Sequence, residues 1–387
     1  MKKVLIYFLM FFTSFQAVVS QQPQKVVKVP NNMINDFAFD LYKKLYSDKG
    51  NVFFSPMSIS TAMAMTMAGA RGETKKQMIE VMHFYDNTEK VHKNLRLMIE
   101  DLKLRNTEGV KISLANALWI HKEFAVNDEF KTAIKKYYKG SINSVDFVKE
   151  VEKSREKINK WVEKETKKKI TELFSPNSIT DDTRLILTNT VYFFGEWLYR
   201  FDEKKTHDAD FNISSTSKIK VPFMHIDDSF KYYSDNTVQI LELPYSDNTI
   251  SMMIALPNDP SKLNMLESRL NNKTLNTWSD NMKKQKVHVE IPKFEMKASY
   301  DLSKILEKLG MTDAFNSKAD FSGISSQGNF AINQILHKTF IEVNETGTEA
   351  AAATAVSMVL TSISDPSNVK FIADHPFLFL HIVAPCI

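Results

Sequence analysis

The chain has 387 residues, of which 43% are hydrophobic and 25% are charged, and its net charge is +4. This composition is typical of a globular protein with ample core material, and the small net charge gives no case for a nucleic-acid partner. No linker, repeat or low-complexity block divides the chain, so we expect one domain over residues 21–387. The nine histidines are scattered and the single cysteine has no partner, so we expect no metal and no cofactor.

Residues 1–20 have the pattern of a secretory signal peptide. Two lysines precede the apolar run Val4–Phe12, and the small residues Val18–Ser20 place the cleavage before Gln21. The apolar run is too short for a membrane span, and no other stretch is long and apolar enough to be one. We therefore expect a secreted, extracellular protein without a membrane partner.

The stretches that follow alternate between helical and strand patterns, which indicates a mixed α+β architecture. Asn32–Leu45 predicts an amphipathic helix, and a second helix begins at Ser55-Pro56 with a capping hydroxyl and a proline in its first turn. Ile112–Trp119 and Arg184–Trp197 predict apolar strands. Further β-rich segments follow in the second half of the chain.

Motifs for enzymatic chemistry are absent. The chain has no G-x-S-x-G elbow, no G-x-x-x-x-G-K-[ST] loop and no H-E-x-x-H pair. Its serines, histidines and aspartates cannot be assembled into a triad from sequence alone. We therefore expect a protein that is not an enzyme and that supplies no catalytic residue.

Two sequons in polar surroundings predict N-glycans on Asn212 and Asn272, as expected of a glycoprotein. A third formal match, at Asn344, falls at the end of a predicted strand, where we expect lower occupancy. The lysine-rich segment Ile158–Ile170 fits a glycosaminoglycan site in composition. Its interspersed glutamates favour a plain solvated helix face instead.

One stretch, Ile341–Ala355, has an unusual composition. It contains the four consecutive alanines Ala350–Ala353. Alanine runs form helices readily, but Lys338–Val343 before the run predicts a strand, and Val356–Ser364 after it is uncharged and β-prone. Small, uncharged residues without proline suit a segment that must enter an existing sheet.

The run from Glu345 to Thr354 closely resembles the hinge of inhibitory serpins, with Thr346 where that family often has an acidic residue. The resemblance extends from about Asn32 to Leu380. It implies a single-domain α+β serpin fold, with three β-sheets, about nine helices and an exposed reactive loop. The hinge residues that it implies are Glu345, Gly347, Thr348, Glu349, Ala350, Ala351, Ala352 and Ala353.

The resemblance also covers Ile158–Ile170, which is similar to the helix that crosses the front of the main serpin sheet. The family usually has glycine where this chain has Lys168. In the same way, the resemblance places four polar residues beneath the centre of the sheet, in the region called the shutter. These residues are Ser55, Ser58, Asn189 and His337. Either they exchange hydrogen-bond partners when the sheet opens, or His337 is simply a satisfied core histidine.

The mechanism that the resemblance implies is suicide inhibition. A serine protease attacks the loop between about Gly347 and Phe371 and forms an acyl-enzyme. The freed upstream segment then enters the main sheet as an extra strand and traps the protease, and we expect the inhibitor to be a monomer. The alternatives are a non-inhibitory serpin with a binding, carrier or storage role, or a poorly active splice product.

The family's usual spacing of 17 residues, counted inclusively from Glu345, predicts the scissile bond at Thr361-Ser362. The loop is about two residues longer than in familiar members, so Leu360-Thr361 and Ser362-Ile363 are the alternatives. No arginine or lysine lies between Thr348 and Asn368, so a trypsin-like protease has no cation to bind. We expect an elastase-like or chymotrypsin-like target instead.

The last stretch departs from the family. After Phe371–Leu380 serpins continue through a turn into one more apolar strand, whereas this sequence stops at Ile387. A missing strand leaves neighbouring backbone groups unpaired and a core slot unfilled. From the sequence we expect this final strand to be missing and folding or activity to be impaired, as in a truncated or alternatively spliced product.

Overall fold

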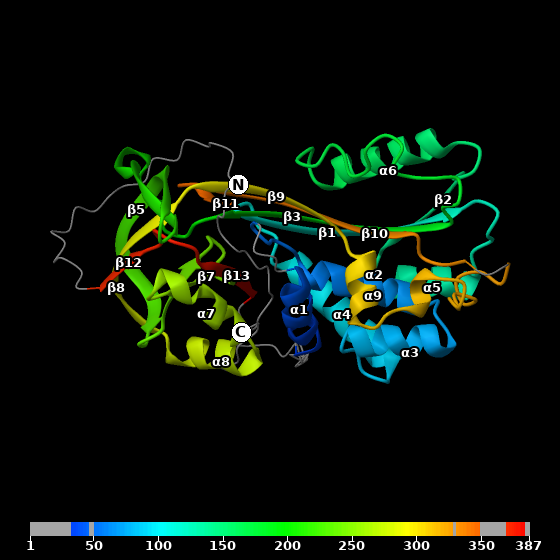
Figure 1. The fold of residues 1–387 in the computed structure, drawn as a ribbon, viewed down its shortest axis with the longest axis horizontal. Helices are drawn as coiled ribbons and strands as arrows, with labels where there is room; N and C mark the ends of the chain where they lie inside the picture. Colours follow the sequence, from blue (N-terminus) through cyan, green and yellow to red (C-terminus); the bar gives the residue numbers. More distant parts are fainter. Residues whose placement is uncertain (1–31, 46–49, 328–329, 349–368, 384–387) are drawn as a thin grey trace.

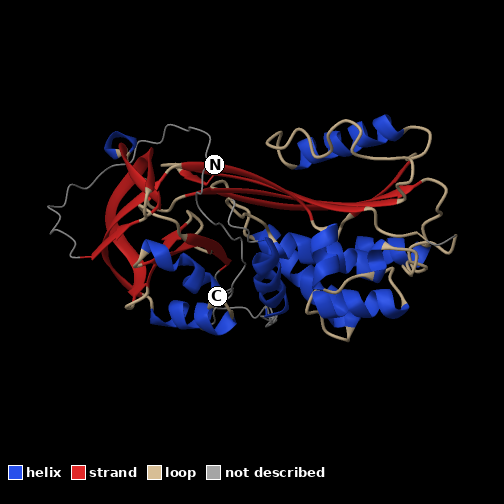
Figure 2. Cartoon of the chain, viewed as in Figure 1, coloured by secondary structure: helices blue, strands red, loops and turns tan. Residues whose placement is uncertain are grey.

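The structure is a computed structural model, and it describes residues 32–45, 50–327, 330–348 and 369–383. Its longest feature is a β-sheet that runs along much of the molecule, with one helix on its upper face and a group of helices on its lower face (Figure 1). A second sheet stands at one end and is flanked by two further helices (Figure 2).

The long sheet, called the main sheet below, has six strands. The order across it is β2-β1-β3-β11-β10-β9. The pairs β1–β2 and β3–β10 are parallel, and the other pairs are antiparallel. The bounds of its strands are β1 Val110–His121, β2 Ser141–Val145, β3 Leu185–Glu196, β9 Phe294–Asp301, β10 Gln334–Val343 and β11 Gly347–Thr348.

The second sheet has the order β12-β8-β5-β6-β7-β13, with β4 paired to β5. Because β5 is 18 residues long and pairs with strands of both halves, two of the three expected sheets are joined into one. Within the described ranges no strand is paired to the outer edge of β13. The bounds are β4 His207–Ser214, β5 Ser217–Ser234, β6 Val238–Pro244, β7 Ile250–Pro257, β8 Lys283–Pro292, β12 Val369–Ile372 and β13 Leu378–Val383.

Nine α-helices lie in the described part of the chain, in agreement with the resemblance. Three short 3-10 helices accompany them at 203–205, 260–262 and 313–315. The bounds are α1 Asn32–Leu45, α2 Pro56–Met67, α3 Gly72–Val81, α4 Thr88–Leu104, α5 Asp128–Tyr137, α6 Val151–Glu165, α7 Leu263–Ser268, α8 Asn272–Asn281 and α9 Ser303–Leu309. None of these helices has the length and apolar character needed to cross a membrane.

Helix α2 is buried on all sides and contacts β1 and β3. The Ser55 side chain caps it by accepting a hydrogen bond from the Ser58 N–H, and Pro56 occupies its first position. Apart from Ile59, its side chains are small or are flexible methionines, and none is charged, so no face needs water. This buried helix therefore forms the floor beneath the centre of the main sheet.

The two faces of the main sheet contribute to two separate hydrophobic clusters. In β3, Leu185 and Leu187 belong to the large cluster on the side of α2, whereas Ile186 belongs to a small cluster on the side of α6. This division follows from the alternation of side chains along a strand. Because both faces are covered, β3 begins as an uninterrupted apolar run.

Helix α6 ends earlier than the sequence predicts. We expected helix to Ile170, but α6 ends at Glu165, because the Thr166 hydroxyl accepts a hydrogen bond from the Ile170 N–H and closes a turn. Lys168 in this turn has φ +67°, the left-handed conformation that glycine adopts most easily. This backbone conformation gives a physical reason for the family's glycine at that position.

Candidate functional site

The hinge begins inside the main sheet. Gly347 and Thr348 form β11 between β3 and β10, with Gly347 opposite Glu196 and Thr348 opposite Gly195. A Cβ atom on Gly347 would lie 2.1 Å from the Gly195 carbonyl oxygen, so the two strands approach too closely for any side chain there. Two of the predicted hinge residues, Gly347 and Thr348, are therefore already inserted in the main sheet.

Thr348 is fully buried at the top of this slot. Its hydroxyl lies 2.7 Å from the Tyr245 hydroxyl, which lies 2.8 Å from Nε2 of His381 on β13. Tyr245 also stacks on Trp197, with ring centroids 4.7 Å apart. Burial lowers the pKa of His381 to about 3, so this imidazole is neutral. The hinge is thus linked through buried hydroxyls to the strand that ends the described chain.

Glu345 anchors the turn that leads into β11. Its carboxylate accepts hydrogen bonds from Lys293 and from the Thr206 hydroxyl, each at 2.7 Å. The Trp197 side chain donates to the Asn344 carbonyl oxygen at 2.9 Å and holds the same turn. Burial raises the pKa of Glu345, but Lys293 and Thr206 lower it more, so the pKa lies below its ordinary value of 4.5.

We expect Glu345→Gln to reveal this charge through the pH dependence of stability. A carboxyl group with a lowered pKa in the folded state stabilises it above the ordinary pKa, and the gain is lost as the pH falls through the lowered pKa. At pH 7 the variant should melt about 1 °C lower, for a loss of about 1 kcal/mol. Melting curves between pH 3 and pH 8 measure this difference.

The matched control is Glu342→Gln, because the contacts of Glu342 are long: 3.9 Å to Lys169 in a half-exposed setting and 3.4 Å from the Asn344 amide. This variant should melt like the wild type at every pH. A Glu345→Gln variant whose melting temperature stays parallel to that of the wild type down to pH 3 would contradict the structural role of the ion pair.

The four predicted shutter residues do meet beneath the centre of the main sheet. His337 on β10 and Asn189 on β3 are paired in register, and the His337 Nδ1 contacts the Asn189 Oδ1 at 2.5 Å. Ser55 N–H donates to His337 Nε2 at 3.0 Å, and the Asn189 amide donates to the Ser58 hydroxyl. Asn116 of β1 also accepts from the Asn189 amide, and the resemblance did not predict this partner.

These contacts define the protonation of His337. Because a backbone N–H donates to Nε2, the ring proton must be on Nδ1, where it is donated to Asn189. Complete burial lowers the pKa of His337 to about 3, in agreement with a neutral ring. The polar groups of the shutter are thus satisfied by one another, and this network joins β1, β3, β10 and the cap of α2.

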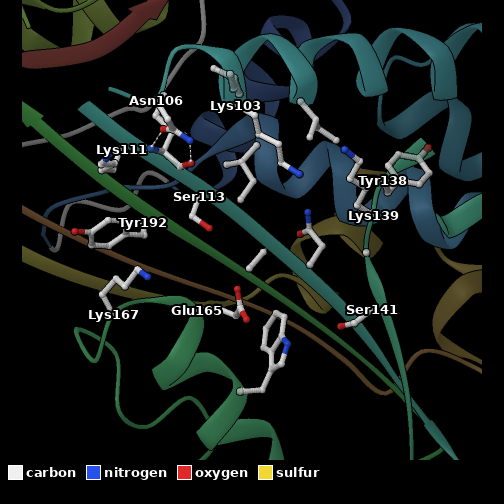
Figure 3. Close-up of a pocket in the computed structure, with 18 residues that line it drawn as sticks. Lys103, Asn106, Lys111, Ser113, Tyr138, Lys139, Ser141, Glu165, Lys167 and Tyr192 are labelled. Atoms are coloured by element: carbon white, nitrogen blue, oxygen red, sulfur yellow. Dashed lines mark hydrogen bonds between the residues drawn. The ribbon is translucent and has the colours of Figure 1, made fainter. Parts of the chain in front are cut away.

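A cavity of about 870 Å³ lies against β1, next to the shutter, and Asn116 is among the residues that line it. Figure 3 shows Lys103 from the end of α4 on one side of the strand, and Glu165 from the end of α6 and Lys167 from the turn after it on the other. Burial and the nearby Lys139 lower the pKa of Lys103. The cavity therefore follows β1 between the end of α4 and the end of α6.

The two asparagines predicted to carry glycans are half-buried and hydrogen-bonded. The Asn212 amide donates to the Asp374 carbonyl oxygen at 3.3 Å, and the Asn272 amide donates to Asp36 at 2.7 Å. Asn272 also accepts from the Asn35 amide at 2.8 Å. A glycan on Asn272 would replace a contact between α1 and α8, and glycosylation at both positions stays a prediction.

Part of the predicted site lies outside the described residues. This applies to the hinge residues Glu349 and Ala350–Ala353, to the predicted bond Thr361-Ser362 with its neighbours Leu360 and Ile363, and to the signal peptide. Sequence reasoning missed the polar partners of the described hinge. These partners are Thr206, Tyr245, Lys293 and His381, and only resemblance to a known site could have identified them, because they come from four different segments of the chain.

Comparison with known proteins identifies the class. The family model described as "Serpin (serine protease inhibitor)" matches residues 32–384, and this chain belongs to the serpin family. A curated relative, the leukocyte elastase inhibitor of Xenopus laevis, is 38% identical over 353 residues, which cover 89% of this chain and 93% of that protein.

Two solved structures show the same fold. Uncleaved ovalbumin has a TM-score of 0.84 and 30% identity, and the match covers 91% of this chain and 95% of that one. Human thyroxine-binding globulin in complex with thyroxine has a TM-score of 0.82 and 28% identity, with 92% and 94% covered. The predicted family and fold are confirmed.

Proposed function

We propose that this protein is a secreted inhibitor of a serine protease that acts by loop cleavage, acyl-enzyme trapping and insertion of the loop into the main sheet. The observation that carries this proposal is the position of β11. Thr348 is buried between β3 and β10, at the start of the line along which these two strands pair, which we call the seam. A cleaved loop needs only to continue along the seam that its first residues occupy.

The register of the seam supports insertion. Below the hinge, β3 and β10 pair directly and in parallel, from Ile186–Val191 to Gln334–Thr339. An incoming strand that continues β11 pairs antiparallel with both neighbours, as β11 does. One set of parallel pairs is thus replaced by two sets of antiparallel pairs, which are somewhat more stable per residue. The sheet gains hydrogen bonds when it opens, so the present state is metastable.

The target in this proposal is an elastase-like or chymotrypsin-like protease. The support is the absence of lysine and arginine between Thr348 and Asn368, together with the name of the Xenopus laevis relative. Secretion is supported by the pattern of residues 1–20, and N-terminal sequencing of the exported protein tests it, with Gln21 as the expected first residue.

We expect the chain to form an SDS-stable complex with neutrophil elastase or chymotrypsin at near one-to-one stoichiometry, and not with trypsin. Mass spectrometry of the small peptide released from the complex identifies the cut, expected at Thr361-Ser362 or at one of the two adjacent bonds. Productive inhibition of trypsin with cleavage at Lys370 would overturn this target class.

The rival proposal is a binding or carrier role. The melting temperature of the loop-cleaved protein, compared with that of the intact protein, distinguishes it from inhibition. Insertion should raise the melting temperature by tens of degrees, because a full strand joins the sheet. A cleaved form that melts with the intact one would indicate a carrier or storage protein. The cleaved form is made with a protease that the chain does not trap, so that this measurement is independent of the complex assay.

A further inference from the structure

Two of the scattered histidines come together on the outer face of the second sheet. His225 and Asp227 lie on β5, and His288 and Glu290 lie opposite them on β8. Asp227 is paired in register with His288, and His225 with Glu290, so the four side chains lie on one face of the ladder. The buried residues Val287 and Val289 alternate with them and face the core.

The donor atoms converge on Asp227. His225 Nε2 lies 2.7 Å from one carboxylate oxygen of Asp227, and His288 Nδ1 lies 2.9 Å from the other. The ligand atoms of these three residues all lie within 4.8 Å of one another. Two imidazoles and one carboxylate form the donor set of many three-residue zinc sites, in which a fourth position stays open.

His288 also has a carboxylate on its other side, because its Nε2 lies 3.0 Å from Glu290. With carboxylates at both ring nitrogens, His288 can donate to both only as an imidazolium cation. A metal ion at Nδ1 removes this requirement, since it replaces the proton facing Asp227 and leaves Nε2–H on Glu290. A carboxylate that accepts from the outer ring nitrogen is the usual support of a metal-bound histidine.

We propose that His225, Asp227 and His288 bind a divalent transition-metal ion such as Zn²⁺, and that Glu290 orients His288 from behind. Nitrogen donors favour such an ion over Ca²⁺ or Mg²⁺, which prefer oxygen. Tetrahedral ligation at 2.0–2.2 Å separates donor atoms by about 3.4 Å. The two contacts with Asp227, at 2.7 and 2.9 Å, need to lengthen by about 0.5–0.7 Å, and the two imidazole nitrogens already lie within 4.8 Å of each other. All three are partly exposed, so they have room to adjust and the ion has a path to them.

The site joins β5 to β8, and β8 pairs in parallel with β12, the first described strand after the reactive loop. Lys370 of β12 is the register partner of His288 and is exposed. The Asp227 and Glu290 carboxylates offset this nearby cation. A bound ion thus links β5 to β8, the strand with which β12 pairs. Binding of this ion does not depend on whether the protein inhibits a protease.

The test uses the full mature chain without an affinity tag, from which bound metal has been removed with a chelator. ZnCl₂ is titrated into this protein, and the heat of binding is measured by calorimetry. We expect one saturable ion per chain, and a visible absorption spectrum of a tetrahedral site when Co²⁺ is used instead. His225→Gln and His288→Gln should each weaken binding at least about tenfold, and Glu290→Gln by about 10–100-fold. The apo variants should unfold like the wild type, because these positions are partly exposed.

The matched control is His83→Gln, which removes a single histidine–aspartate pair with Asp40 at 2.9 Å that no second histidine joins. Its affinity for Zn²⁺ should equal that of the wild type. Absence of stoichiometric binding, or an unchanged affinity in the His225→Gln, His288→Gln double variant, would overturn the site. A rise in melting temperature with Zn²⁺ that these variants lose would support it independently.

Discussion

Thr348→Arg is expected to reduce the SDS-stable complex to less than about a tenth of the wild-type yield, while cleavage of the loop continues. Thr348 is fully buried between β3 and β10, and its hydroxyl is paired with Tyr245. A guanidinium at this position would displace the neutral Thr348–Tyr245 hydroxyl contact, and burying a charge without a partner costs several kcal/mol. The hinge would leave the sheet, insertion would slow, and the acyl-enzyme would be hydrolysed before it is trapped.

Thr348→Ser is the matched control, because it keeps the hydroxyl and is smaller than threonine. It should form complex like the wild type. The comparison is made on gels and by the stoichiometry of inhibition, with the loop-cleaved product quantified in the same samples. If Thr348→Arg trapped protease at full stoichiometry, insertion along the seam between β3 and β10 would not be the trapping step.

Asn189→Ala is expected to accelerate spontaneous loop insertion or polymerisation by tenfold or more. The substitution removes the acceptor of the His337 ring proton and the donor to Ser58 and Asn116. Each buried polar group left unsatisfied costs about 1–3 kcal/mol, so the closed sheet loses about 3 kcal/mol or more. Because the Asn189–His337 contact crosses the seam between β3 and β10 that must open, part of this loss lowers the barrier to opening.

The control is a variant that lowers the free energy of unfolding by a similar amount at a site far from the seam. Leu275→Ala removes a buried side chain of α8, with an expected loss of about 2–5 kcal/mol. Native gels at a temperature where both variants are folded then separate gating from stability. Equal rates of polymerisation would favour the simpler view that His337 and Asn189 are satisfied core residues with no gating role.

Local sequence signals predicted the elements well where the pattern itself determines the structure. Asn32–Leu45 is a helix over its whole predicted range, and the cap at Ser55-Pro56 forms as expected. The end of α6 was wrong by five residues, because the Thr166 hydroxyl closes a turn that helical periodicity does not encode. Local sequence propensity thus predicted that a helix is present more accurately than it predicted the residue at which the helix ends.

The shutter could be predicted only through resemblance. Asn189 meets Ser58 across 131 positions of sequence and His337 across 148, and no spacing rule connects them. Asn116 lay within a predicted strand and was overlooked, since one polar residue in an apolar strand carries no partner information. Its burial on the α2 side of the sheet and its contact with Asn189 appear only once β1 and β3 are in register.

The sequence contains a local pattern that indicates part of the histidine cluster. His225 and His288 are each followed two residues later by a carboxylate, Asp227 and Glu290, in β-rich sequence. On a strand this spacing places both side chains on one face. The register that sets one pair opposite the other depends on tertiary structure, so the meeting of the two pairs could not be read from the sequence.

The division of the interior into two clusters has a consequence for how this molecule can change shape. The small cluster, which includes Ile158 and Val162 of α6 and Phe340 of β10, shares no residue with the large cluster on the opposite face of the sheet. Helix α6 can therefore separate from the sheet as a local unfolding unit while the large cluster keeps the strands in order. The rate of such a rearrangement depends on the small cluster and on polar contacts such as that of Lys157 with the Ser144 carbonyl oxygen, and not on the large cluster that sets most of the overall stability.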